Sequence, residues 1–175
     1  YPIHPRRTRL MKKYLGAFLL LAVLAAAGYI LFAPKRQSAP AFALPNLQGQ
    51  NVDQTALQGK VTLINFWFPS CPGCVTEMPK LIRMHQDYQG KNFQIIAISI
   101  SVPSDPLPVV QTYAQTHRLP FTVLHDAQGR TQQAYQVIAT PTSFLVDKNG
   151  RIAKTYVGEP DFAEVYRLTD QLLAE

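Results

Sequence analysis

The stretch NFWFPSCPGCVTEMP, residues 65–79, contains both cysteines of the 175-residue chain, separated by two residues. Before it, VTLINFWF (61–68) is a continuous run of β-branched and aromatic residues, typical of a strand that is buried on both faces. From Pro72 onward, apolar residues recur at helical spacing until Gly90 ends the pattern. The two thiols therefore lie where a central strand passes into a helix.

This position predicts that the two thiols are redox-active. Residues three apart on a helix face each other, within the Cα separation that a disulfide accepts, so the pair can close without moving the backbone. Cys71 lies at the helix N-terminus, where free N–H groups favour an anion and lower the thiol pKa from about 8.5 into a range of roughly 3.5 to 7.5. Cys74 lies one turn further in and is expected to be more buried. We therefore expect the Cys71 thiolate to attack a substrate disulfide and Cys74 to resolve the mixed disulfide.

Other uses of a cysteine pair fit the sequence less well. A structural disulfide across two residues closes a very small loop and removes little unfolded-state entropy. A zinc site needs two further ligands, and the four histidines have no zinc-like spacing: His4, His85, His117 and His125. Haem attachment would need histidine directly after Cys74, where Val75 stands. We expect a redox-active disulfide with no metal and no other cofactor.

The rest of the chain alternates between strand and helix patterns. We expect a single helical turn ending at Gly59, strands at 92–100 and 121–126, helices at 106–119 and 132–136, a hairpin at 142–158 turning at Asn149-Gly150, and a closing helix at 160–174. This order predicts an α/β fold with helices on both faces of a central mixed sheet, in which parallel strands come first and an antiparallel hairpin follows.

The excess of positive charge belongs to the N-terminal segment. The net charge is +6 and the pI is about 9.4. Residues 1–36 contain seven of the seventeen basic residues and no acid. The other ten basic residues face eleven acids, so residues 37–175 carry a net charge of −1. The main part of the chain offers no basic stripe to a phosphate backbone, and we expect no nucleic-acid partner.

An apolar run, LGAFLLLAVLAAAGYILF, occupies residues 15–32 and contains eighteen residues without a charge. As a helix it would reach about 27 Å, close to the ~30 Å hydrocarbon core of a bilayer. Lys12-Lys13 before the run predicts a cytoplasmic N-terminus and an exported remainder. A signal peptide cleaved near Ala25–Ala27 or Ala39–Ala41 is the alternative, but the run is longer than a usual signal core. We therefore expect an uncleaved membrane anchor.

These features divide the chain into four expected parts. The first two are a cytoplasmic segment at 1–14 and a transmembrane anchor at 15–33; residues 1–10 precede Met11, which would be a conventional start. The other two are a linker at 34–41, rich in proline, serine and alanine, and a folded domain at 42–175. We expect a single-pass protein of the cytoplasmic membrane with its folded domain on the periplasmic, extracytoplasmic side.

Two stretches together, VTLINFWFPSCPGCVTEMPKL and ATPTSFLVDKNGRI, closely resemble thioredoxin-like proteins of the TlpA/ResA type. The resemblance covers roughly residues 40–174. It implies a thioredoxin-like fold and a membrane-anchored, extracytoplasmic thiol-disulfide oxidoreductase, a class that includes cytochrome c maturation reductases. Asn65 supports this branch, because thioredoxin itself has a buried aspartate at that place.

The resemblance also implies roles for individual residues. Cys71 matches the attacking cysteine, Cys74 the resolving one, and Glu77 an acid that exchanges a proton with the resolving thiol. Thr140-Pro141 matches a cis-proline loop that presents backbone groups to a partner. The other implied substrate-binding residues are Trp67, Pro72 and Gly73. From the residue pattern alone, Glu77 could equally be a helix-start acid and Pro141 an ordinary turn proline.

The chain departs from the family at two places. Tryptophan usually precedes the first cysteine, and here Ser70 follows Pro69. The intervening pair, Pro72-Gly73, is neither the Gly-Pro of thioredoxin nor the Pro-Pro frequent in this family. Both changes lie where the reduction potential and partner contacts are set, so the resemblance does not specify either.

We expect a reductase that reduces disulfides of exported client proteins, with apocytochromes c among the candidates, and that is recharged by a membrane electron donor of the DsbD/CcdA type. An oxidase that donates disulfides, as DsbA does, would have the same site. A peroxidase would need threonine three residues before its reactive cysteine, where Phe68 stands. A copper-handling module is the non-enzymatic alternative, but its thioredoxin-like relatives space the cysteines three apart and add a histidine.

Overall fold

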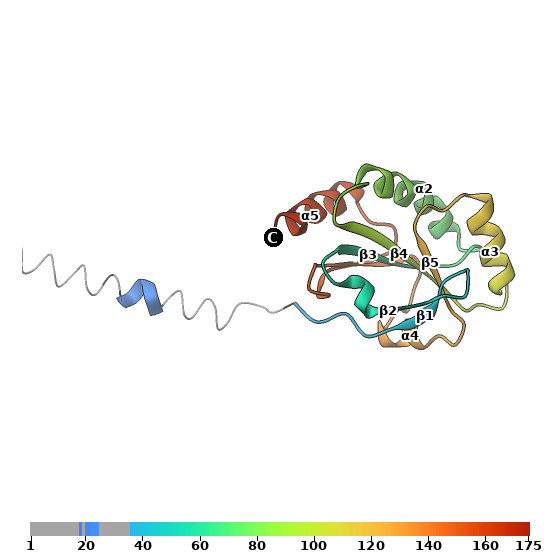
Figure 1. Ribbon diagram of the computed structural model, residues 1–175, viewed down its shortest axis with the longest axis horizontal. Coiled ribbons are helices and arrows are strands. Elements are labelled where there is room, and N and C mark those ends of the chain that lie inside the picture. Colours follow the sequence, from blue (N-terminus) through green and yellow to red (C-terminus); the bar gives the residue numbers. More distant parts are fainter. Residues whose placement is uncertain (1–17, 19, 25–35) are drawn as a thin grey trace, which may run out of the picture. The chain divides into compact units, whose positions relative to one another are not determined.

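The central strand, β3 (Val61–Trp67), lies in the middle of a five-stranded sheet of order β5-β4-β3-β6-β7 (Figure 1). It pairs in parallel with β4 (Phe93–Ile100) and antiparallel with β6 (Thr142–Val146). The edges are β5 (Thr122–Asp126), parallel to β4, and β7 (Ile152–Val157), antiparallel to β6. All seven residues of β3 are buried, as its unbroken apolar run predicted. The predicted α/β fold with a central mixed sheet is confirmed.

The computed structural model describes residues 18, 20–24 and 36–175 of the chain. Residues 18 and 20–24 are helical, and among the described residues no helix has both the length and the apolar character needed to cross a membrane. Most of the anchor predicted at 15–33 lies outside the described residues, as do the segment 1–14 and the first two residues of the predicted linker. These assignments therefore stay predictions.

Helices cover both faces of the sheet (Figure 1). On one face lie α2 (Pro72–Asp87), α3 (Leu107–Thr116) and α5 (Phe162–Ala174). On the other lie the 3₁₀ turn η1 (Gln54–Leu57) and α4 (Arg130–Ala134). The connections through α2 and α3 both lead from the centre of the sheet toward β5. Because such crossovers are right-handed, both helices are placed on the same face.

Successive side chains of β3 enter different cores, because side chains alternate along a strand. Phe66 packs with Tyr135 and Phe144 on the α4 face, with ring centroids 5.0 to 5.9 Å apart. Trp67 belongs to the opposite core, which also contains both cysteines and the buried residues of α2 and α5. The cysteine pair is thus continuous with the main hydrophobic core.

The hairpin at the start of the domain was not predicted. A small hairpin forms from β1 (Ala43–Pro45) and β2 (Asn51–Asp53), and Asn46, directly after β1, forms an isolated antiparallel bridge with Leu124 of β5. Strands of three residues are too short to show a period in the sequence, and for this reason the pattern gave no signal. Leu44 is buried and packs in the core of the α4 face.

The segment expected to be a linker at 34–41 joins the domain from Arg36 onward. Ala39 N donates to Gly150 O at 2.9 Å, and Ile152 N donates to Gln37 O at 2.8 Å. Arg36 forms an ion pair with the buried Asp147, with 3.1 Å between their nitrogen and oxygen atoms. The folded domain therefore includes residues 36–41, upstream of the expected start at residue 42, because these residues extend the β6–β7 hairpin.

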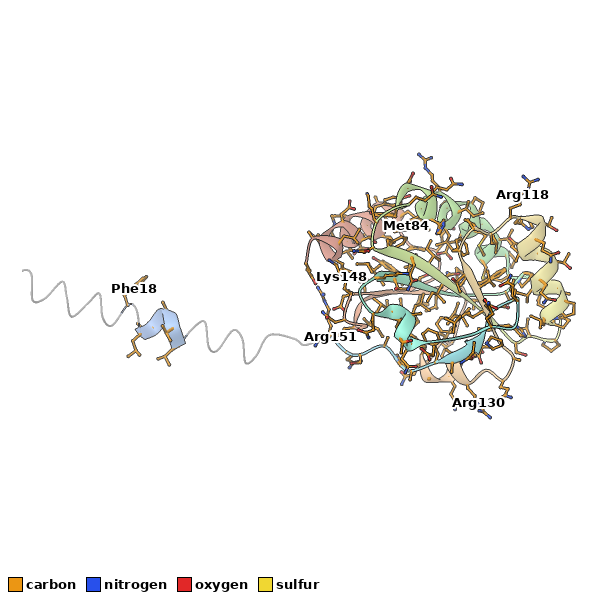
Figure 2. The ribbon with its side chains drawn as sticks, in the orientation of Figure 1. Phe18, Met84, Arg118, Arg130, Lys148 and Arg151 are labelled. Atoms are coloured by element: carbon orange, nitrogen blue, oxygen red, sulfur yellow. A yellow bond between two sulfur atoms is a disulfide. The ribbon has the colours of Figure 1, made fainter. Side chains whose placement is uncertain are left out.

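The remaining elements follow the predicted ranges with small shifts. The short helix expected at 132–136 is α4, which begins two residues earlier because Gly129 adopts a positive φ of 66° and Asp126 accepts a hydrogen bond from Gln132 N. The β6–β7 turn contains Gly150 at φ 73°, as the Asn-Gly pair predicted. Figure 2 shows the exposed cations Arg118, Arg130 and Arg151 on different sides of the domain, so these three do not form a stripe.

Candidate active site

The cysteine pair lies at the junction of β3 and α2. Cys71 is the N-cap of α2, and Pro72 occupies the first helical position, where its missing N–H costs nothing. The two cysteines form a disulfide with 5.3 Å between their Cα atoms. Cys74 N also donates to Cys71 Sγ at 3.2 Å. The predicted position at a strand-to-helix junction is confirmed.

The two sulfurs are not equivalent. Cys71 is 5% exposed and Cys74 is 1% exposed, so a partner can approach only the first. When the pair is reduced, the start of α2 and the N–H of Cys74 both favour a thiolate at Cys71. Cys74 has no such stabilisation and lies in the core. This asymmetry fits attack by Cys71 and resolution by Cys74.

A loop from the start of β6 closes over the pair. The Thr140-Pro141 peptide bond is cis, and Thr140 Oγ1 donates to Cys71 Sγ at 3.6 Å. Pro141 lies so close to Gly73 that a Cβ at residue 73 would stand 3.2 Å from Pro141 Cδ. A side chain at residue 73 would crowd this contact. The structure thus brings Thr140, Pro141 and Gly73 together at the attacking sulfur, as the resemblance implied.

The other predicted substrate-binding residues differ in exposure. Pro72 is exposed beside the disulfide, and Gly73 is half-buried. Trp67 is fully buried and packs against Tyr113 of α3, with ring centroids 5.1 Å apart. Trp67 therefore presents no surface to a client in this structure, because α3 covers it, and it supports the active-site loop from the core.

Glu77 is a buried acid three residues beyond Cys74. Its Oε2 accepts a hydrogen bond from Asn65 Nδ2 at 3.2 Å, and its Oε1 has no hydrogen-bond partner among the described residues. Burial raises the pKa of Glu77 from 4.5 to about 7, against the lowering effect of the Asn65 hydrogen bond. Near neutral pH the side chain can therefore either take or give a proton. Since residues three apart share a helix face, it lies on the side of Cys74.

Three neighbours of Glu77 escaped the sequence reasoning. Asn65 Nδ2 also donates to Ser143 Oγ at 2.9 Å, and these two residues are opposite each other in the β3–β6 register. Lys80 of α2 forms an ion pair with Glu159, from the loop after β7. Both charges act on the Glu77 pKa, Glu159 raising it and Lys80 lowering it. Strand register brings Ser143 to Asn65, and loop packing brings Glu159 to Lys80, so no local pattern could have identified Ser143 or Glu159. Lys80 lies three residues after Glu77 on α2, and helix spacing could have identified it.

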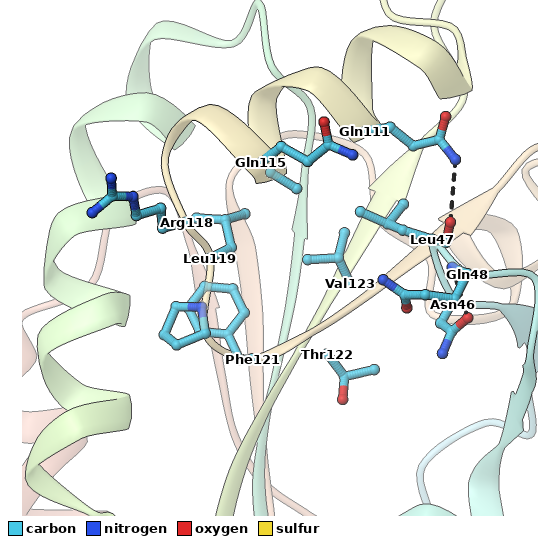
Figure 3. A pocket seen from close by; sticks show the side chains of 12 residues that line it. Asn46, Leu47, Gln48, Gln111, Gln115, Arg118, Leu119, Phe121, Thr122 and Val123 are labelled. Carbon is cyan, nitrogen blue, oxygen red and sulfur yellow. Dashed lines mark hydrogen bonds between the residues drawn. The ribbon is translucent and has the colours of Figure 1, made fainter.

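The pocket shown in Figure 3 is not the active site. It has a volume of about 550 Å³ and lies between the β1–β2 turn, α3 and the start of β5. Its lining is rich in amide side chains, and Gln111 Nε2 donates to Leu47 O at 3.1 Å. It contains neither a nucleophile nor an acid. The cysteines lie at the other end of the parallel strands, after the end of β3.

Fold and site together define a thioredoxin-like thiol-disulfide oxidoreductase. Residues 36–155 match the AhpC/TSA family. ResA, a thiol-disulfide oxidoreductase of Geobacillus thermodenitrificans, is 33% identical in an alignment of 149 residues that covers 80% of this chain and 84% of ResA. The thioredoxin-like protein YneN of Bacillus subtilis is 28% identical in an alignment of 158 residues that covers 85% of this chain and 92% of YneN. The chain belongs to the AhpC/TSA family, and within it to the thioredoxin-like proteins of the TlpA/ResA type.

Solved structures agree with this assignment. The solution structure of a Neisseria meningitidis protein described as a thioredoxin is 51% identical and superposes with a TM-score of 0.73, covering 81% of this chain and 93% of that one. A crystal structure from Chlorobium tepidum, described as a thiol:disulfide interchange protein DsbE, is 32% identical with a TM-score of 0.69, covering 81% and 96%. The protein is an enzyme whose active site is the Cys71/Cys74 pair.

We predict that Glu77→Gln removes a pH dependence of stability. The folded state keeps the Glu77 proton until about pH 7, whereas the unfolded state loses it near 4.5, so the free energy of unfolding falls as pH rises between these values. The loss reaches about 3 kcal/mol above pH 7. Glutamine cannot ionise and can still accept from Asn65. Relative to the wild type, the variant should therefore gain about that amount between pH 4.5 and pH 8.

Urea unfolding of the two oxidised proteins at both pH values measures this difference. Glu164→Gln, the same change at a half-exposed position of α5 that pairs with Lys154, gives the baseline. An equal difference between the Glu77→Gln variant and the wild type at both pH values would show that Glu77 is not a titrating buried acid.

Proposed function

We propose that this protein is a dithiol reductase that acts outside the cytoplasm and reduces disulfides of exported client proteins. The observation that carries this proposal is the burial of the pair beside a buried acid. A strong oxidant needs a reduced form that is stabilised. Here Cys74 lies in the core with Glu77 one turn further on, and both features disfavour charge on the resolving sulfur. The reduced pair thus gains no thiolate stabilisation at Cys74, which favours the disulfide relative to a pair in which both sulfurs are stabilised.

The exchange proceeds in two steps. The Cys71 thiolate attacks one sulfur of a client disulfide, forms a mixed disulfide and releases the other client sulfur as a thiolate. Cys74 then loses its proton to Glu77 and attacks Cys71 Sγ. This step closes the Cys71–Cys74 disulfide and releases the second client thiolate. Two electrons pass to the client, and no further cofactor is needed.

The cis-proline loop would hold the client during this exchange. Thr140 already lies at the attacking sulfur, and Pro141 forms the adjacent surface with Pro72 and Gly73. A client polypeptide lying across this loop would place its disulfide over Cys71, the only sulfur of the pair that it can reach. Apocytochromes c are the client class that the TlpA/ResA likeness favours.

Location and recharging belong to the same proposal. The apolar run at 15–32 after Lys12-Lys13 supports an anchor in the cytoplasmic membrane, with the folded domain on the periplasmic side. An enzyme that reduces clients there must be reduced again after each cycle. A membrane electron donor of the DsbD/CcdA type would deliver two electrons by the same thiol-disulfide exchange.

The reduction potential of the Cys71–Cys74 couple tests the direction of electron flow. We expect a value near or below roughly −250 mV, on the scale where thioredoxin is about −270 mV and DsbA about −120 mV. Equilibration of the full chain with dithiothreitol mixtures, followed through the fluorescence of its one tryptophan, Trp67, gives the value. A potential near −120 mV would mean that the protein donates disulfides, and the proposed direction would be wrong.

The roles of the two cysteines lead to a second prediction. Cys74→Ser should accumulate mixed disulfides with clients, because nothing resolves them, whereas Cys71→Ser should form none. Non-reducing gels of cells that produce each variant detect these species. Multiple-turnover insulin reduction by Cys74→Ser at the wild-type rate would contradict the resolving role.

Location can be tested by fusing alkaline phosphatase, which is active only outside the cytoplasm, to Glu175. We expect an active fusion that stays with the membrane fraction. The same fusion starting at Arg36 is the control and should remain inactive, because it lacks the apolar run. An inactive full-length fusion would place the domain in the cytoplasm, and a fully released active one would indicate cleavage.

A further inference from the structure

A second buried acid contacts the active-site loop from the side of β3 on which β4 lies. Asp105, in the loop between β4 and α3, is 2% exposed. It accepts three hydrogen bonds: from Ser70 N at 3.0 Å, from Ser70 Oγ at 2.5 Å and from Ser104 Oγ at 2.6 Å. Two of the three come from Ser70, the residue directly before the attacking Cys71.

We propose that Asp105 is a positioning residue of the active site, which holds Ser70 so that Cys71 Sγ is fixed at the start of α2, and whose negative charge shifts the couple toward the disulfide. This inference deepens the proposed function and rests on it for the identity of the reactive pair.

The geometry supports the positioning part. One carboxylate oxygen of Asp105 bonds the backbone of Ser70 and the other bonds its side chain, so the residue is held at two points. On the next peptide unit, Cys71 N donates to Phe68 O at 3.1 Å and closes a tight turn. The turn and the Asp105 carboxylate together determine the position of Cys71 after the end of β3. The short hydroxyl of a serine can donate to the Asp105 carboxylate at this place, whereas the tryptophan expected here from the family has no hydroxyl group.

A role in capping α3 does not account for Asp105. Aspartate just before a helix commonly accepts a hydrogen bond from the first backbone N–H groups. The N-cap of α3 is Pro106, and no side chain caps this helix. The hydrogen bonds that Asp105 accepts instead connect the β4–α3 loop to the active-site loop. The start of α3 therefore has no side-chain cap, and the adjacent Asp105 binds the active-site loop instead.

The effect of the Asp105 charge on the couple follows from the groups that surround Cys71. The start of α2, Cys74 N and Thr140 Oγ1 all favour a thiolate at this sulfur. Asp105 opposes them, because it holds a negative charge against Ser70, the residue directly before Cys71. Among the described residues, Glu77 lies one turn beyond Cys74 on α2, and the Lys80–Glu159 ion pair acts on Glu77. Asp105 thus makes the couple more reducing.

Asp105→Asn separates charge from position, because asparagine keeps an oxygen for Ser70 N and removes the charge. In the full chain we expect the reduced Cys71 to form its thiolate at lower pH, by about one unit, seen as absorbance at 240 nm. The equilibrium constant with dithiothreitol should shift about tenfold toward the dithiol, which corresponds to about 30 mV. Asp161→Asn, at the N-cap of α5, is the matched control and should leave both values unchanged.

Asp105→Ala removes the positioning as well. Its insulin-reduction rate should fall at least tenfold below that of Asp105→Asn, because a misplaced sulfur attacks poorly. If the alanine variant does not fold, Ser70→Ala replaces it. This variant loses the side-chain bonds to Asp105 and Ser104 and keeps the backbone bond to Asp105, and its insulin-reduction rate should fall below that of the wild type. A rate equal to that of the wild type would contradict the positioning part.

The proposal is wrong if Asp105→Asn leaves both the Cys71 titration and the equilibrium constant within twofold of the wild type. That result would leave Asp105 as a purely structural acid. The shift is measured relative to the wild type, so it tests Asp105 even if the wild-type potential proves to be that of an oxidant. Failure of the proposed direction and failure of this inference are therefore distinguishable.

Discussion

The site depends on one constraint: a strand that is hydrogen-bonded on both sides and buried on both faces ends at Trp67, directly before the loop that holds Cys71. β3 cannot shift without breaking the ladders to β4 and β6, so the position of the first cysteine is set by the sheet. The neighbours also bring their loops to it. β6 is antiparallel and starts beside the end of β3, whereas β4 is parallel and ends there. The cis-proline loop and the Asp105 loop therefore flank Cys71 as a consequence of strand direction.

Two buried acids give this site its chemical character. Glu77 remains in the core with one carboxylate oxygen unpartnered, an arrangement that reduces stability above neutral pH by about 3 kcal/mol. Natural proteins tolerate such a cost where a function requires it. Here the benefit we propose is a proton acceptor on the face of the resolving thiol. Asp105, in contrast, has its hydrogen bonds satisfied and acts on the residue beside the attacking thiol. The two acids thus address different cysteines.

The departures of this chain from the family pattern, at Ser70 and Gly73, lie in contacts around Cys71. Ser70 allows Asp105 to hold the active-site loop, and Gly73 allows Pro141 to approach the start of α2. Neither replacement alters the sheet or the exchange chemistry that the chain shares with ResA and its relatives. Both alter the immediate surroundings of Cys71. In this chain the sheet and α2 position the cysteine pair, and the residues around Cys71 are where we propose that potential and client are set.

The amino-acid sequence by itself determined the cysteine pair at a strand-to-helix junction, the mixed sheet, and the β6–β7 hairpin, because these depend on short-range periodicity, helix geometry and turn chemistry. Tertiary structure alone decided the contact of Asn65 with Ser143, 78 residues apart, and that of Ser70 with Asp105, 35 apart. It also decided that the chain joins the domain at Arg36 and that Trp67 lies beneath α3. The physical reason is that a polar contact between distant residues leaves no periodic pattern in either segment. Only the pairing and packing of whole elements brings such residues within hydrogen-bonding distance.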